Sequence, residues 1–303
     1  MSGRRCPACA HLTLAGDAYC ESCGQPVRFA PDDHLEIVEG PVAVVSDVGR
    51  RRRSNEDAFC VATEDQRMAV VVCDGVSTTP EADRAASIAS RTAMTVLRQG
   101  IHLEPGPSID EMTRLLNRAV EAAQDAVGAL AFPVAGGETV STAPSTTMVA
   151  AVARPGWAAV ANVGDSRAYW IPDQGPVTQV TEDDCEMGGL VEPADTAGPQ
   201  VLRVGRRITR WIGADSGRVP PRVTTFPVTS AGLLLLCTDG LWQYFDRPAS
   251  LGLRVRDHRG AHPQVPGGHV ARGLLDDALQ AGGGDNVTVA VLSLMPPHQD
   301  ERG

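Results

Sequence analysis

Short apolar stretches of strand length recur along the chain from residue 42 to residue 294. Most are rich in valine, alanine and leucine, and charged or glycine-containing turns separate them. Stretches of this kind, bounded by turn residues, predict β-strands. They cover residues 42–46, 58–62, 68–73, 147–153, 157–162, 167–171, 223–228, 233–237 and 287–294.

Three longer segments have helical periodicity. Apolar residues recur every three to four positions over residues 79–100, 108–127 and 269–281. The second segment begins with Ser108-Ile-Asp-Glu111, which has the spacing of a capping box. Strands, then a helix pair, then strands again predict an α+β sandwich rather than alternating βαβ units.

The first 25 residues carry a different signal. Two Cys-x2-Cys pairs supply four thiols, from Cys6, Cys9, Cys20 and Cys23. Each pair can present two thiolates from one tight turn, and two pairs complete a tetrahedral Zn²⁺ shell. Such a closed site is structural, and metal binding would supply folding energy that so short a segment lacks. A redox-active pair or chance clustering is the alternative.

These signals divide the chain into four predicted parts. They are a zinc ribbon over residues 1–25, a linker over 26–40, a large domain over 41–295 and a polar tail over 296–303. No apolar run approaches the ~20 residues that a membrane-spanning helix needs. The N-terminal arginines are not followed by the apolar segment of a secretory signal. We therefore expect a cytoplasmic protein.

The charge balance limits the classes of partner. The formal net charge is -10 and the pI is near 5.2, which argues against general affinity for nucleic acid. The chain contains no lysine, so a Walker-type phosphate loop is excluded. Any side-chain cation that holds a phosphate must be an arginine, whose planar guanidinium suits bidentate contact.

Several aspartates lie where a strand ends or a tight turn begins. They are Asp57, Asp74, Asp239 and Asp285, and two of them are followed at once by glycine. A single Asp-Gly is most simply a turn. Carboxylates gathered from several strand ends would instead form a hard-oxygen site suited to Mg²⁺ or Mn²⁺.

The order of these motifs resembles that of the metal-dependent (type 2C, PPM) serine/threonine protein phosphatases of bacterial type. The resemblance covers nearly all of residues 41–294, and its motifs are strong only as a set. It implies a four-layer α/β/β/α sandwich of two antiparallel sheets flanked by helix pairs. The matching segments are 46–57, 71–75, 162–167, 180–183, 235–240 and 284–288.

The resemblance also implies a site for two or three Mn²⁺ or Mg²⁺ ions. In the family pattern, Asp74 would bridge two ions and the Gly75 carbonyl would bind one of them. Asp239 and Asp285 would bind the other ion. Asp165, together with Asp239, would serve a third ion.

Three further residues take roles from the same resemblance. Glu56 and Asp57 would hold metal-bound waters, and Arg52 aligns with the arginine that grips the substrate phosphate. Direct attack by a metal-activated hydroxide would follow, without a covalent phosphoenzyme. Cys73, beside Asp74, has no Cys-x5-Arg context and is expected to be a buried apolar thiol.

The chain departs from the family pattern at three places. Residues 76–78 are Val-Ser-Thr, so no general-acid histidine follows the Asp-Gly pair. Residues 145–147 are Ser-Thr-Thr, where many members have Gly-Thr-Thr. Asp184-Cys185 replaces a common His-Ser. None of these changes removes an expected metal ligand.

A flap-like segment over residues 188–213 is the last candidate surface. Its arginines suggest a surface for phosphoprotein substrates, and a solvated basic loop is an equal alternative. They are Arg203, Arg206, Arg207 and Arg210, grouped around Trp211.

The leading hypothesis is a phosphatase acting on phosphoserine and phosphothreonine proteins, with kinases and their substrates as candidate partners. The alternative is a pseudophosphatase that binds phosphoproteins while the ribbon docks on an unknown partner. A zinc-ribbon nucleic-acid binder is disfavoured by the acidic charge.

Overall fold

The structure is a computed structural model of the 303-residue chain. It describes residues 4–5, 12–13, 22, 33–102, 106–130, 143–191, 203–260 and 267–297. Within the first 32 residues it describes an antiparallel pair of two-residue strands, β1 (Arg4–Arg5) and β2 (Leu12–Thr13). The four cysteines of the predicted zinc ribbon lie outside the described residues, as does the tail after residue 297.

The first of two large sheets has six strands, and every neighbouring pair is antiparallel. Three of its strands are almost wholly apolar and are buried on both faces. In spatial order the strands are β11 (Thr178–Gln179), β10 (Arg167–Pro172), β16 (Gly232–Cys237), β17 (Val287–Leu294), β4 (Val42–Asp47) and β3 (His34–Glu39).

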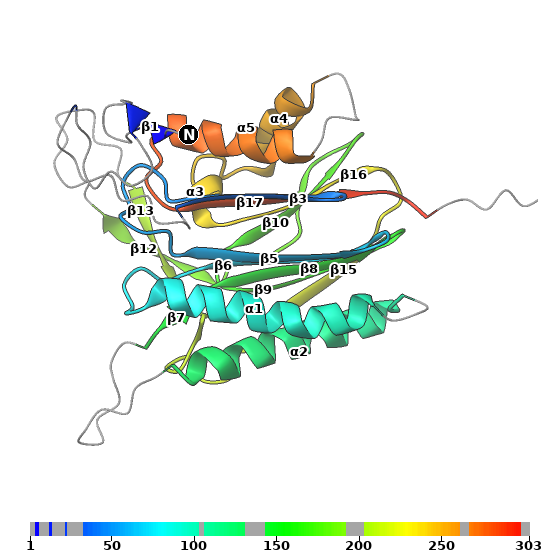
Figure 1. The fold of residues 1–303 in the computed structure, drawn as a ribbon, viewed down its shortest axis with the longest axis horizontal. Helices are drawn as coiled ribbons and strands as arrows, with labels where there is room; N and C mark the ends of the chain where they lie inside the picture. Colours follow the sequence, from blue (N-terminus) through cyan, green and yellow to red (C-terminus); the bar gives the residue numbers. More distant parts are fainter. Residues whose placement is uncertain are drawn as a thin grey trace, which may run out of the picture.

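The second large sheet has five strands and is also antiparallel throughout. It packs face to face on the first sheet (Figure 1). Its strands are β15 (Arg222–Pro227), β9 (Trp157–Val163), β8 (Met148–Arg154), β6 (Arg67–Asp74) and β5 (Asp57–Glu64).

Helices cover the outer faces of both sheets (Figure 1). The pair α1 (Ala82–Ile101) and α2 (Ile109–Gly128) lies on the five-stranded sheet. On the six-stranded sheet lie α3 (Asp239–Trp242), α4 (Pro248–Arg259) and α5 (Gly267–Gln280).

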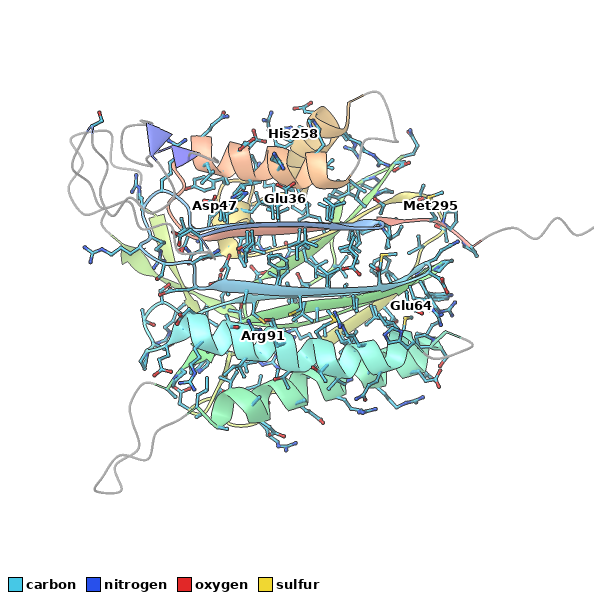
Figure 2. All side chains as sticks on the ribbon, in the orientation of Figure 1. Glu36, Asp47, Glu64, Arg91, His258 and Met295 are labelled. Atoms are coloured by element: carbon cyan, nitrogen blue, oxygen red, sulfur yellow. The ribbon has the colours of Figure 1, made fainter. Side chains whose placement is uncertain are left out.

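Alternating side chains divide the core into three clusters. In β16, Leu234 and Leu236 face the other sheet, whereas Leu233 and Leu235 face the helices. Side chains fill the space between the two sheets (Figure 2). The predicted α+β fold of two antiparallel sheets with helices is therefore confirmed.

Two smaller, two-stranded antiparallel sheets are also present. In one, β12 (Cys185–Val191) pairs with β13 (Arg203–Ile208), which gives the flap-like segment a strand structure. In the other, β7 (Ser145–Thr146) pairs with β14 (Ile212–Gly213).

The start of α2 was predicted accurately because a capping box marks it. The capping box is present, because Ser108 accepts from the backbone N–H of Glu111 and Glu111 accepts from that of Ser108. Helix α1 begins at Ala82, and Glu81 before it has a left-handed backbone with φ of 51° and no side-chain cap. Helix α4 was not predicted, because only Leu251, Gly252 and Val255 are buried and no apolar stripe results.

The predicted linker over residues 26–40 is wrong for residues 34–39, which form β3. This strand occupies the edge of the six-stranded sheet, and all six of its residues are exposed. Polar and apolar residues alternate only over His34-Leu-Glu-Ile37, and Val38 then breaks the alternation that marks a half-buried strand. No helix within the described residues is long and apolar enough to cross a membrane.

Candidate functional site

The predicted acidic residues gather at one end of the sandwich. Asp57 begins β5, Asp74 ends β6, and Asp239 follows β16 after a single threonine. Asp165 follows β9, and Asp285 precedes β17. Neighbouring antiparallel strands run in opposite directions, so strand starts and strand ends meet at the same edge. Asp47 marks this end in Figure 2, whereas Glu64 and Met295 mark the opposite end.

Asp57 and Asp74 are direct partners across the β5–β6 ladder. Asp74 lies on the same face of β6 as Val70 and Val72, whose side chains belong to the cluster between the sheets. Side chains alternate along a strand, so both carboxylates point toward the rim of the inter-sheet space.

Two close backbone approaches bring the remaining acids to this pair. Gly240, directly after Asp239, lies against the Asn286 carbonyl, and a Cβ there would come within 1.9 Å of it. Gly49, at φ +78°, lies against the Asp285 carbonyl, and its Cβ would come within 2.1 Å. Only glycine permits these contacts.

The carboxylates act on one another electrostatically. Removal from water raises the pKa of Asp74 well above its ordinary value, and the charges of Asp57, Asp239, Asp165 and Asp285 add to the rise. Removal from water likewise raises the pKa of Asp239, with Asp165 and Asp285 as the next causes. Several like charges in one low-dielectric place favour a bound cation.

Asp57 is held by hydroxyl groups from the opposite sheet. Its Oδ2 accepts from Thr288 Oγ1 at 2.7 Å and from Thr238 Oγ1 at 2.9 Å. Thr288 Oγ1 lies 2.7 Å from Ser46 Oγ, which accepts from Asn55 Nδ2 at 2.9 Å. Removal from water raises the pKa of Asp57 to about 7, although the two threonine hydrogen bonds oppose the rise. The chain of hydroxyls orients the carboxylate.

Asn286 fastens the loop that carries Arg52 and Glu56. Its Nδ2 donates to the carbonyls of Val48 and Ser54, each at 2.9 Å, and its Oδ1 accepts from the Glu56 N–H at 2.9 Å. Asn286 lies in the segment 284–288 that matches the family pattern, but the sequence alone assigned it no role. The hydroxyls that hold Asp57 were not assigned a role either. Their hydrogen-bond partners lie far away in sequence, up to the 242 positions that separate Ser46 from Thr288.

Arg52 lies at the rim of this site. Its Nη2 donates to Asp285 Oδ2 at 2.7 Å, and its side chain is 35% exposed. Burial alone would lower the pKa of the guanidinium, but the hydrogen bond and charges of Asp285, with those of Glu56 and Asp239, outweigh burial and raise that pKa. Arg51 and Arg53 on either side are exposed.

Gly75 is held tightly beside Asp74. Its N–H donates to the Glu56 carbonyl at 3.1 Å, and a Cβ would come within 2.6 Å of the Ala82 carbonyl. Thr146 Oγ1 and the Thr147 N–H each donate to the Asp74 carbonyl at 2.8 Å. These contacts fix the Asp74-Gly75 backbone.

The donor set fits hard divalent cations that keep much of their water. Glu56 Oε2 and Asp57 Oδ1 are buried and have no hydrogen-bond partner among the described residues. Within that part of the chain, no three acidic, histidine or cysteine side chains are close enough to enclose an ion by themselves. Mg²⁺ in particular retains several waters and uses only one or two carboxylates.

Cys73 does not suit covalent chemistry. Its side chain is fully buried on the helix-facing side of β6, and burial raises the pKa of its thiol well above the ordinary value. A thiol in such surroundings is inert.

Of the flap-like arginines, two have described side chains. Arg207 is 80% exposed and lies 3.3 Å from Glu186. Arg210 instead donates to the buried carboxylate of Asp184, at 2.9 and 3.1 Å. Arg210 therefore belongs to the base of the segment rather than to a free basic surface.

A family model described as protein phosphatase 2C matches residues 49–258 of the chain. The serine/threonine phosphatase stp of Listeria innocua is 27% identical over 199 residues, which are 65% of this chain and 75% of stp. The serine/threonine protein phosphatase PstP of Mycobacterium tuberculosis is 26% identical over 254 residues. That match covers 84% of this chain but only 45% of PstP, so the chain spans about half of that relative.

Solved structures of the same kind share the fold. The catalytic domain of PstP in complex with two manganese ions has a TM-score of 0.57 and 25% identity, and the match covers 83% of this chain and 96% of that one. A bacterial serine phosphatase has a TM-score of 0.64 at 22% identity, covering 85% and 98% of the two chains.

Proposed function

The chain belongs to the protein phosphatase 2C family, and from this membership we propose that it hydrolyses phosphoserine and phosphothreonine in proteins. The observation that carries the proposal is the convergence of Asp57, Asp74, Asp165, Asp239 and Asp285 at one rim of the sandwich.

The metal ions would be held as the family pattern implies. Asp74, the Gly75 carbonyl, Asp239 and Asp285 would bind two Mn²⁺ or Mg²⁺ ions, and Asp165 would serve a third. Such ions, when bound, would lower the pKa of a coordinated water and so supply the nucleophile at neutral pH. Glu56 Oε2 and Asp57 Oδ1, which lack hydrogen-bond partners in the part of the chain that the structure describes, support a water-mediated role for both residues.

The protein's own groups would position the reaction. The hydroxyls of Thr238 and Thr288 hold one oxygen of Asp57 and leave the other for a water. Arg52 would neutralise charge on the phosphoryl oxygens from the rim. Residues 76–78 are Val-Ser-Thr, so no histidine directly after Asp74-Gly75 would protonate the leaving group.

The first test is Mn²⁺-dependent release of phosphate from a phosphothreonine peptide. We expect turnover by the parent and a drop on the order of 100-fold or more in Asp239→Asn, since even outer partners of metal ligands cost about 10- to 100-fold when removed. The control is Asp246→Asn, which makes the same charge change at an exposed acid shortly after α3. It should keep the parent rate.

Two other outcomes would overturn parts of the proposal. Equal turnover by the parent and Asp239→Asn would remove Asp239 from the ligand set. A folded parent that binds the phosphopeptide without releasing phosphate would be a pseudophosphatase, the alternative reading. The presence of an acid at every expected metal position favours the enzyme.

The N-terminal cysteines support a second, structural proposal. Cys6, Cys9, Cys20 and Cys23 would hold one Zn²⁺ in a ribbon that docks on a partner of unknown identity, in a cytoplasmic protein. Elemental analysis of the purified chain would find one zinc ion per chain, and a zinc-free preparation with intact cysteines would contradict it.

A further inference from the structure

Two consecutive acids, Asp183 and Asp184, make separate ion pairs near the site. Asp183 pairs with Arg167, whose Nη2 donates at 2.7 Å. The Asp184 side chain is 0% exposed and lies 2.9 Å from both Arg210 Nη1 and Arg222 Nε. A buried carboxylate is strongly destabilising unless it is paired, and two guanidiniums pair with this one.

The partners of Asp184 come from three different segments. Arg210 follows β13 by two residues, and Arg222 is the first residue of β15. The Gly164 N–H donates to Asp184 Oδ2 at 3.1 Å. One carboxylate therefore joins the end of the β12–β13 hairpin, an edge strand and the turn after β9.

Backbone hydrogen bonds reinforce the same junction. The Asp184 N–H donates to the Gly164 carbonyl at 2.9 Å, and the Thr209 N–H donates to the Asp184 carbonyl at 2.9 Å. Strand β12 begins at the next residue, Cys185. Both legs of the hairpin are thus fastened at Asp184, one through the chain and one through Thr209 and Arg210.

This junction is directly connected to the rim of the sandwich where the predicted metal-binding acids lie. Gly164 precedes Asp165, and the Trp242 indole N–H donates to the Asp165 carbonyl at 2.9 Å. Gly164 has φ of +99°, and a Cβ there would lie 2.6 Å from the Thr147 methyl group, so the turn has little room to shift. Gly164 is hydrogen-bonded to Asp184 and shares a peptide unit with Asp165. A displacement of Asp184 would therefore reach Asp165.

We infer that Asp184 is a positioning residue that holds the base of the β12–β13 hairpin against the turn carrying Asp165. The part of this inference that concerns turnover rests on the proposed function. A histidine, common at this position in the family that the sequence resembles, could not accept from two cations at once. A carboxylate can accept from both arginines, and it supplies the acceptor that lies between the two guanidiniums.

The test compares Asp184→Asn with Asp277→Asn. Asp277, on α5, is a matched control because its 12% exposed carboxylate also contacts two basic side chains, those of Arg254 and His258. His258 lies in the outer helix layer, away from the rim (Figure 2). Both variants should lose thermal stability to a similar degree.

The readout that does not need activity is tryptic cleavage after Arg207, within β13. Trypsin cuts this chain only after arginine, because it has no lysine. We expect Asp184→Asn to be cleaved there about tenfold faster than the parent, since cleavage tracks local opening of the hairpin. Asp277→Asn should be cleaved at the parent rate.

The second readout uses Mn²⁺-activated turnover of a phosphothreonine peptide. Asp184→Asn should need a higher Mn²⁺ concentration for half-maximal rate, whereas Asp277→Asn should not. Parent-like cleavage in Asp184→Asn, or equally fast cleavage in both variants, would overturn the inference. An inactive parent would defeat only the proposed function, because the cleavage test would still stand. If Asp184→Asn fails to fold, Arg210→Gln, which removes one of the two guanidiniums, should show the same faster cleavage, and a parent rate would overturn the inference.

Discussion

Arg52 differs from its neighbouring arginines by what it touches. It donates to Asp285 and lies within the electrostatic reach of Glu56 and Asp239, whereas Arg51 and Arg53 are exposed. A guanidinium held at that rim can meet a phosphate with the fork of N–H donors that lies in its plane. In the sequence, the family resemblance alone distinguished Arg52 from these neighbours.

At the residue scale, Arg52→Ala should lower kcat/KM for a phosphothreonine peptide by about 100-fold, because one charged partner of the phosphoryl group is lost. Steady-state kinetics at saturating Mn²⁺ measure the effect. Arg53→Ala removes the same charge one residue away and should stay within about twofold of the parent. A similar loss in both variants would mean that general positive charge, rather than Arg52, matters.

The loop over residues 48–56 works as one element with the start of β17. Three hydrogen bonds to Asn286 and the contact of Gly49 with the Asp285 carbonyl hold it in place. Arg52, Glu56 and Asp57 all depend on this loop for their position.

At the element scale, Gly49→Ala tests that dependence. It places a Cβ at positive φ, which by itself costs about 1 kcal/mol or more, and drives it into the Asp285 carbonyl. We expect a clear loss of stability in urea melts and of Mn²⁺-dependent turnover. Gly40→Ala has a similar φ of +56° with nothing within 4 Å, so it should show the backbone cost alone and keep its turnover. Equal effects would show that the contact with Asp285 is unimportant.

The whole molecule carries an electrostatic cost at the rim. It removes several carboxylates from water and places them together, and both effects, removal from water first, raise the pKa values of Asp57, Asp74 and Asp239. For an acid, a folded-state pKa above the unfolded one means that the folded state binds more protons. Stability then falls as pH rises through that interval.

At this scale, the chelator-treated protein should lose stability as pH rises from about 4 to about 7. The interval follows from Asp57, whose pKa moves from 3.8 to about 7, and each such group contributes at most about 1.4 kcal/mol per pH unit. Thermal melts at several pH values measure the slope. Saturating Mn²⁺ should raise the melting temperature most at the high end, since the cation binds the ionised carboxylates.

Asp57→Asn isolates one contribution to this slope. The amide oxygen can still accept from the two threonines, but it no longer titrates. The variant should show a flatter pH dependence than the parent without metal. Superimposable profiles would mean that Asp57 does not titrate abnormally in the folded state.

Much of the fold could be predicted from the sequence because its signals are local. The strand over residues 287–294 and the capping box of Ser108 and Glu111 depend on side chains a few positions apart. Strand β3 and helix α4 were missed because neither has a strong buried stripe to reveal it. Their positions depend on contacts with distant segments.

By itself the sequence determined which residue types stand at the strand ends: carboxylates at Asp57, Asp74, Asp239 and Asp285, with glycines where backbones must approach. Only the tertiary structure decided which groups hold them, because Asp57 meets Thr288 across 231 positions and Asp184 meets Arg222 across 38. Periodicity reports burial within one element, and a hydrogen bond between elements depends on how the sheets pack and in what register. That register joins an ordinary threonine or aspartate to the site, and no local pattern encodes it.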